Sequence, residues 1–323
     1  MFINSSKFLF LSFMTVGVMI SLSCNSWIVV WSGMELFLLS FIPYFCNFSF
    51  VSSECSMKYF LIQGLSSSLF AFCVFFLFLY NYMIFKSFLC FSLLIKLGCA
   101  PFHSWIMGVV SGMGYDSLFI FFSVSKLPPL FLLSYVCFNL DYFILLSLLI
   151  GSVGGLNHSS LKKVMGFSSV FNLGFLIYLL NISSLWLIYF IFYSLMIFFV
   201  FYFFYSYSIE YMNQFFVSGS YSSKISFWIL FLSLGGMPPM LGFFIKLICI
   251  EFCMINNDYL ISLFMVFFSL VVMFYYIRCC FISLTIFVSS IKWNSFLIES
   301  SLSFFSFLSL MLFPFCFVLK MLF

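Results

Sequence analysis

Long apolar stretches separated by short polar ones run through the chain from Phe8 to Phe323. A helix needs about 20 apolar residues to cross a membrane, and on that measure the pattern predicts about eleven transmembrane helices. Their expected spans are residues 8–22, 26–46, 57–79, 87–107, 115–137, 141–157, 164–181, 184–206, 225–249, 258–279 and 301–321. The connections leave no room for an extramembrane domain, so we expect one all-α, polytopic transmembrane domain over residues 1–323.

The composition agrees with a membrane protein. Hydrophobic residues make up 65% of the chain and charged residues only 6%, whereas a soluble domain carries about 25% charged residues. The 12 cysteines form no CxxC or Cys/His array, so we expect no zinc or iron–sulfur site. Basic residues are adjacent only at Lys162–Lys163, which gives no patch for nucleic acid. Abundant Phe with scarce Ala and Arg indicates thymine-rich codons, as in a small organellar genome.

The basic residues outside the membrane are unevenly distributed between its two sides. Eleven spans place most of them on the side of the N-terminus: Lys7, Lys58, Lys162, Lys163, Lys224, Arg278 and Lys292. The other side receives only Lys86 and Lys320. By the positive-inside rule, the N-terminus is expected in the compartment equivalent to the cytoplasm.

Four ionisable residues lie near the middle of predicted spans: Glu35, Lys96, Lys126 and Lys246. Each charge costs roughly 2.5–3.5 kcal/mol at a helix centre, so these side chains should face one another or a hydrated interior. A buried lysine holds its proton less tightly, and a nearby carboxylate reverses this effect. The set therefore suits a proton relay. The alternative is a set of static ion pairs, although one carboxylate cannot balance three lysines.

Helix-breaking residues accompany two of these lysines. The breaks are expected at Pro101 in the fourth span and at Gly235, Gly236, Pro238 and Pro239 in the ninth. Backbone freed by a break is tolerated in a membrane only where protein or water satisfies it. Because the breaks lie five helices apart, they indicate two inverted five-helix repeats, residues 8–137 and 141–279, followed by a helix at 301–321. Two ordinary proline kinks are the alternative.

Further candidates for the relay are His103, His158 and Lys163. Histidine titrates near neutral pH and can pass protons, although a single histidine is often only hydrogen-bonded. The run Gly151–Gly155 superficially resembles a nucleotide-binding loop, but it follows no strand, so we expect close helix packing there.

Five stretches carry a family resemblance: residues 31–35, 57–63, 96–105, 154–169 and 233–246. In order and spacing they resemble the subunit 2 family of mitochondrial NADH dehydrogenase, one of the antiporter-like families of respiratory complex I. The resemblance covers most of the chain. Two sites depart from the family pattern: Val124-Ser125 stands where Trp-Gln is frequent, and Met107-Gly108 where Pro-Glu is frequent.

The resemblance implies a proton-translocating subunit in the mitochondrial inner membrane, with its N-terminus on the matrix side. It implies that Glu35, Lys96, Lys126 and Lys246 match the proton path of the family. Electron transfer from NADH to ubiquinone, with its FMN and iron–sulfur clusters, would occur in other subunits, and this chain would hold no cofactor. Its expected partners are the other membrane subunits and phospholipids. A cation/proton antiporter subunit and a purely structural membrane scaffold are the alternative functions.

Overall fold

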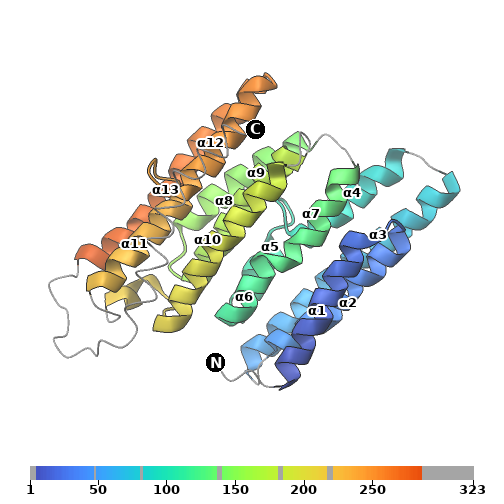
Figure 1. Ribbon diagram of the computed structural model, residues 1–323, viewed down its shortest axis with the longest axis horizontal. Helices are drawn as coiled ribbons and strands as arrows, with labels where there is room; N and C mark the ends of the chain where they lie inside the picture. Colours follow the sequence, from blue (N-terminus) through green and yellow to red (C-terminus); the bar gives the residue numbers. More distant parts are fainter. Residues whose placement is uncertain are drawn as a thin grey trace. The chain divides into compact units, whose positions relative to one another are not determined.

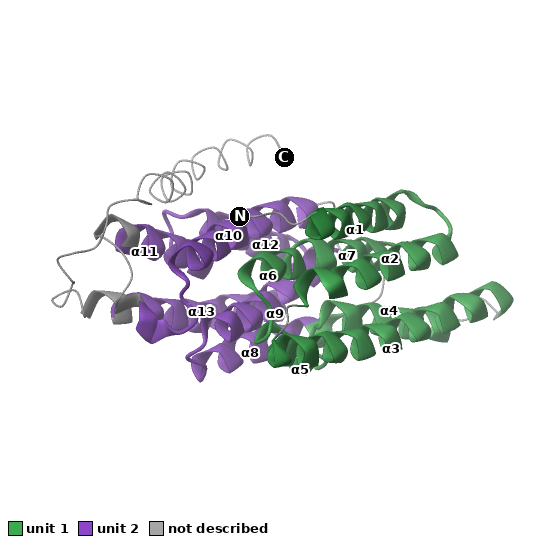
Figure 2. Ribbon diagram, turned by 90° about the horizontal axis from the view of Figure 1, so that it is seen from below, with its two compact units in different colours: residues 1–143 green, residues 144–323 purple. Residues whose placement is uncertain are grey.

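The computed structural model describes residues 5–46, 49–80, 83–136, 140–180, 185–216 and 221–285. These residues form helices and turns, with one isolated bridge between Ser160 and Tyr211 and no strand (Figure 1). The chain divides into two compact units, unit 1 over Met1–Phe143 and unit 2 over Ile144–Phe323 (Figure 2).

Unit 1 consists of the N-terminal helices. They are α1 (Ser5–Ser23), α2 (Trp27–Phe45), α3 (Phe50–Tyr80), α4 (Met83–Leu97), α5 (Ser104–Val110), α6 (Tyr115–Phe122), the 3₁₀ turn η1 (Val124–Lys126), α7 (Leu127–Val136) and the start of α8 (Asp141–Leu156). α1 packs closely on α2, because a Cβ atom on Gly17 would lie only 2.8 Å from the backbone oxygen of Gly33. α3 contacts α2, α4 and α5, and α4 contacts α7.

Unit 2 contains the rest of α8 and the later helices. They are α9 (Leu161–Leu180), α10 (Leu185–Tyr207), the 3₁₀ turn η2 (Met212–Phe216), α11 (Tyr221–Gly235), α12 (Leu241–Ile255) and α13 (Tyr259–Thr285). α9 is the core of this unit: Leu161 and every residue from Val164 to Leu180 are buried. It contacts α10 and α12.

The glycine run near the end of α8 packs against neighbouring helices, as the sequence predicted. A Cβ atom on Gly151 would lie 2.5 Å from the backbone nitrogen of Phe171 in α9. A Cβ atom on Gly155 would lie 2.8 Å from the ring of Tyr275 in α13. Small residues thus let these helices approach to backbone contact.

The first ten predicted spans coincide with helices or pairs of short helices, and the all-α membrane fold is confirmed. Seven described helices are long and apolar enough to cross a membrane. The fourth, sixth and ninth spans are not among them. The fourth and ninth are split into pieces of 15 residues or fewer, and α8 in the sixth span has only 16 residues. The predicted span 301–321 lies outside the described residues, so the count of eleven is not confirmed.

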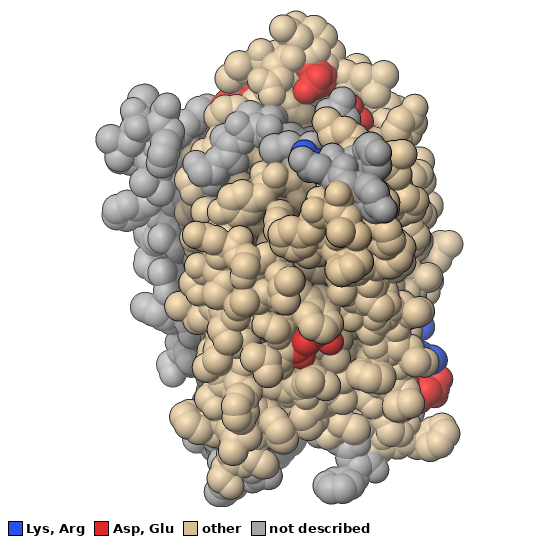
Figure 3. All heavy atoms as spheres, turned by 90° about the vertical axis from the view of Figure 1, so that its right-hand side faces the viewer, with Lys and Arg blue, Asp and Glu red and all other residues tan. Residues whose placement is uncertain are grey.

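One helix begins earlier than its apolar pattern indicates. α3 starts at Phe50 rather than at residue 57, because Glu54 and Lys58 pair one turn apart and support a polar first turn. The outward faces of the helices are apolar, with Phe8, Phe78 and Leu263 all strongly exposed. Figure 3 shows one face on which charged side chains are few. Such a surface is suited to lipid.

Candidate functional site

The predicted break in the fourth span follows Lys96 directly. α4 ends at Leu97, and Gly98 adopts a φ of +67° that favours glycine. The chain then turns through Pro101 and starts α5 at Ser104. The amide of Gln63 on α3 donates to the backbone oxygen of Lys96 over 3.2 Å. A neighbouring helix therefore satisfies a carbonyl that the break leaves free.

The side chain of Lys96 is held inside unit 1. It is 9% exposed, its Nζ lies 3.8 Å from the sulfur of Met34, and it stands 5.8 Å from the ring centroid of Phe70. Glu35 is near enough to interact electrostatically with Lys96, yet the two form no ion pair. One carboxylate oxygen of Glu35 is buried without a hydrogen-bond partner among the described residues. The structure therefore contains no static ion pair between Glu35 and Lys96.

A cavity of about 30 Å³ adjoins Lys96. Its walls come from α2, α3, α4 and the region of η1, and they include Tyr59, Gln63, Ser125 and Pro128. A water molecule needs roughly 10–15 Å³ and two to four polar partners. The cavity can therefore hold water between Lys96 and the segment that carries Lys126.

Lys126 lies at a second interruption, within the fifth predicted span. α6 ends at Phe122, η1 follows, and α7 begins at Leu127. Lys126 is 3% exposed, and its Nζ stands 5.4 Å from the ring centroid of Phe122. The helix is thus interrupted just before Pro128 and Pro129, and Lys126 at this interruption lies inside the unit.

In unit 2, the ammonium group of Lys246 is hydrogen-bonded to backbone oxygens at the break in the ninth predicted span. α11 ends at Gly235 and α12 begins at Leu241, with Gly236 at a φ of +90°. The Nζ of Lys246 donates to the backbone oxygen of Gly235 over 2.7 Å and to that of Leu234 over 3.2 Å. Lys246 is 6% exposed and stands 5.6 Å from the ring centroid of Phe171. Carbonyls released by the break therefore hold the ammonium group.

A second cavity, of about 20 Å³, adjoins Lys246. Asn172 of α9 and Tyr189 and Tyr193 of α10 line it, and the hydroxyl of Tyr189 donates to the amide oxygen of Asn172 over 2.9 Å. The buried hydroxyl of Tyr193 has no hydrogen-bond partner in the part of the chain that the structure describes. Buried hydroxyls are normally paired, so this cavity is suited to an ordered water.

The remaining predicted candidates lie outside these two cavities. His103 is half-buried at the start of α5, with its Nδ1 3.1 Å from the backbone oxygen of Pro101. His158 lies in the turn between α8 and α9 and stacks on Phe167. Burial lowers the pKa of His158, and Lys163 lowers it further. His158 and Lys163 therefore form a group at the start of α9.

The ion pairs between side chains of the described residues are at the periphery. Lys58 pairs with Glu54, and the Nζ of Lys162 lies 2.8 Å from a carboxylate oxygen of Glu210. No group of three His, Cys, Asp or Glu residues able to hold a metal ion is found in the described ranges.

Three polar residues of the site were not predicted: Asn172, Tyr189 and Tyr193. Asn172 is an amide within an otherwise apolar buried helix, and burying an amide is costly unless it is hydrogen-bonded. That signal was present in the sequence. The two tyrosines could not be distinguished from the other members of a set of 18.

Comparison with known proteins yields one family. The model of the NADH:quinone oxidoreductase/Mrp antiporter transmembrane family matches residues 24–273. NADH-ubiquinone oxidoreductase chain 2 of Anopheles gambiae is 37% identical over 92% of this chain and 90% of the relative. The protein of the same name from Locusta migratoria is 30% identical over 91% of this chain and 90% of the relative.

Solved structures show the same fold at lower sequence identity. A chain of respiratory complex I from Thermus thermophilus aligns with a TM-score of 0.83 at 18% identity, over 96% of this chain and 78% of that chain. A chain of the Mrp complex from Dietzia sp. aligns with a TM-score of 0.74 at 16% identity, over 84% of this chain and 59% of that chain.

Proposed function

We propose that this chain carries protons through its interior. It belongs to the NADH:quinone oxidoreductase/Mrp antiporter family and is an antiporter-like membrane subunit of respiratory complex I. It is part of an NADH:ubiquinone oxidoreductase, and its similarity to NADH-ubiquinone oxidoreductase chain 2 of two insects disfavours a separate cation/proton antiporter. Its location would be the mitochondrial inner membrane, with the N-terminus on the matrix side as the distribution of basic residues suggests.

One observation carries the proposal: Lys96 and Lys246 are buried beside water-sized cavities and form no ion pair with any residue that the structure describes. A lysine needed only to hold helices together would gain most from a carboxylate at contact distance. An ammonium next to water can instead give up a proton and recover it. Lys246 keeps its acceptors in the backbone, so the charged form is held in place without a fixed counter-ion.

The other candidates would extend the path within each unit. In unit 1, Glu35 acts on the charge of Lys96, and the cavity that includes Ser125 leads toward Lys126. His103 lies after the break and would take protons from the surface. In unit 2, His158 and Lys163 would collect protons at the start of α9. The Tyr193 cavity would then supply water to Lys246.

The two units would correspond to two inverted repeats, residues 8–137 and 141–279, with residues 301–321 as a further helix. Each unit contains a split helix that bears a buried lysine, Lys96 on α4 and Lys246 on α12. This parallel, and the division of the chain after Phe143, support the repeat assignment. We propose that the redox cofactors, including NADH, FMN, the iron–sulfur clusters and ubiquinone, are bound by other subunits of the complex.

The decisive experiment replaces Lys246 by Met, which keeps most of the side-chain length and removes the charge. The assembled complex is reconstituted in vesicles, and protons moved per NADH oxidised are measured. The ratio should fall, while the matched variant Lys58→Met, at an exposed lysine, leaves it unchanged. The scaffold alternative predicts an unchanged ratio for Lys246→Met, Lys96→Ala and Glu35→Gln in fully assembled complex, and that result would remove the proposal.

A further inference from the structure

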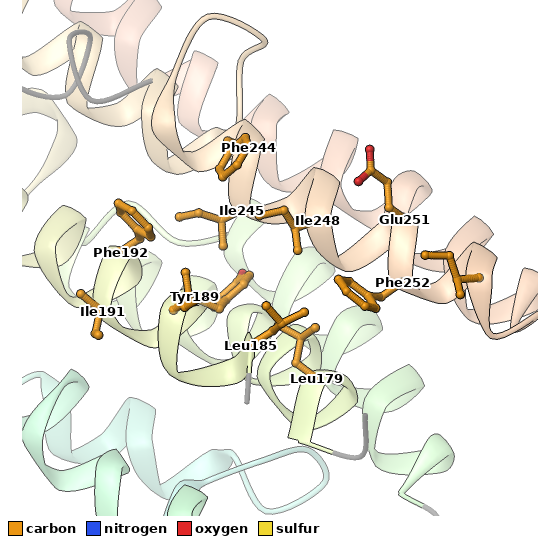
Figure 4. Close-up of a pocket in the computed structure, with 12 residues that line it drawn as sticks. Leu179, Leu185, Tyr189, Ile191, Phe192, Phe244, Ile245, Ile248, Glu251 and Phe252 are labelled. Carbon is orange, nitrogen blue, oxygen red and sulfur yellow. The ribbon is translucent and has the colours of Figure 1, made fainter. Parts of the chain in front are cut away.

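An apolar groove of about 450 Å³ lies between α10 and α12 in unit 2. Its walls are large hydrophobic side chains, with Leu185 and Phe192 on α10 facing Ile248 and Phe252 on α12 (Figure 4). Ile255 at its end is strongly exposed, so the groove is open to the surroundings of the helices. Its volume lies within the range of sites that bind small molecules.

The groove has the length of one membrane leaflet. It extends along α12 from Phe244 to Ile255, a rise of about 16 Å at 1.5 Å per residue. Half of the hydrocarbon thickness of a bilayer is about 15 Å. Leu179 near the end of α9 and Leu185 at the start of α10 line it as well. The groove therefore runs from the C-terminal ends of α9 and α12 along most of α12 and the first part of α10.

A single carboxylate stands among the lining residues, that of Glu251. It lies one turn before the end of α12, and its carboxylate is turned away from the apolar walls (Figure 4). An acyl chain in the groove would therefore bring its headgroup to the level of Glu251. A carboxylate there favours a cationic group, and most of all one with N–H donors.

We propose that this groove binds one acyl chain of a phospholipid whose headgroup carries a primary ammonium, with that ammonium paired to Glu251. Phosphatidylethanolamine has this chemistry. Choline lipids offer the charge without the donors, and anionic lipids such as phosphatidylglycerol lack the cation.

The bound chain would also cover the cavity beside Lys246. Tyr189 and Ile245 line both the groove and that cavity, so a single layer of side chains separates them. A lipid in the groove would keep the cavity water from escaping sideways into the bilayer. This sealing role rests on the proposed function, whereas binding of the lipid does not.

The test uses the purified complex and a phosphatidylethanolamine with a photoreactive group midway along one acyl chain. After illumination, labelled residues are mapped by mass spectrometry. Labels should fall on Phe192 of α10 and Ile248 of α12. The phosphatidylglycerol probe with the same chains should label these positions severalfold less, and the phosphatidylcholine probe should give an intermediate yield.

Two variants test separately the binding of the acyl chain in the groove and the pairing of the headgroup with Glu251. Ile248→Trp fills the groove and should abolish labelling with every headgroup. Glu251→Gln leaves the groove open and should remove only the preference for the ethanolamine lipid. Leu263→Trp, on the exposed face of α13, is the matched control and should change neither.

The proposal is overturned if labelling is equal for all headgroups and persists in Ile248→Trp, or if a helix of another subunit occupies the groove in the assembled complex. Should Ile248→Trp fail to assemble, the headgroup preference of Glu251→Gln still decides the question. Because labelling requires no turnover, its outcome is independent of whether Lys246 conducts protons. A separate measurement of proton leak in Ile248→Trp vesicles tests the sealing role.

Discussion

The break between α11 and α12 can be tested by substitution, because two adjacent glycines there differ in whether the backbone and its surroundings accept a Cβ atom. Gly236 has a φ of +90°, and a Cβ atom there would lie 3.2 Å from both Cδ and Nζ of Lys246. Gly235 has no such φ, and a Cβ atom there would meet only ordinary contacts, the nearest at 3.6 Å. We predict that Gly236→Ala impairs the site of Lys246 and that Gly235→Ala does not.

The magnitude follows from the backbone and from the contact. A non-glycine residue in the left-handed region costs about 1–2 kcal/mol, which is a factor of about 5–30 in the population of the intact break. The new methyl group also presses on the ammonium that Gly235 and Leu234 hold through their carbonyls. Loss of a hydrogen bond to a charged group adds about 1.5–3 kcal/mol. Either the backbone of the break or the hydrogen bonds of Lys246 must therefore give way in the variant.

The assay is the number of protons moved per NADH oxidised, measured in vesicles that contain the assembled complex. The Gly236→Ala complex should lose much of this ratio while retaining electron transfer, and Gly235→Ala should match the unmodified complex. Assembly of each variant is checked by native electrophoresis. If the two alanine variants pump equally well, the geometry of the break does not govern Lys246, and our account of that lysine is wrong.

Two further predictions concern groups near the path. Tyr193→Phe removes a hydroxyl that lies beside Lys246 and has no hydrogen-bond partner among the described residues, and it should slow vesicle acidification severalfold. Tyr44→Phe, at a buried tyrosine of α2, should have no effect on that rate. His158 has a lowered pKa in the folded chain, so this side chain binds more protons in the unfolded chain over the range from its ordinary pKa of about 6.5 down to its lowered value. Thermal stability should therefore decline as the pH falls through that range, and less so in His158→Gln; equal declines would contradict the assignment.

Much of the site could be predicted because charge and backbone chemistry are conspicuous in an apolar chain. Lys96 and Lys246 interrupt hydrophobic runs, and a charge in such a run must be enclosed by protein or water. The nearby prolines interrupt a helix, and the nearby glycines weaken it. Both lysines are indeed buried beside breaks in the structure.

The contribution of uncharged polar groups could not be predicted. Tyr193 lines the Lys246 cavity, but tyrosine is equally suited to a membrane surface, a core or a polar network. Only the packing of α9 against α10 brings its hydroxyl near Asn172. The hydrogen bonds from Lys246 to backbone oxygens could not be predicted from the sequence either. Every residue carries a backbone carbonyl, and only the folded structure shows which two lie next to the ammonium group.

The burial of α9 from Val164 to Leu180 has a consequence for how the protein is made. Synthesis proceeds from the N-terminus, so α9 enters the membrane before α10 and α12, which it contacts in the finished unit. During that interval its amide, Asn172, lacks the hydroxyl of Tyr189 that later bonds to it. A nascent chain halted after α9 and before α10 therefore exposes to lipid a polar group that the finished unit encloses and pairs.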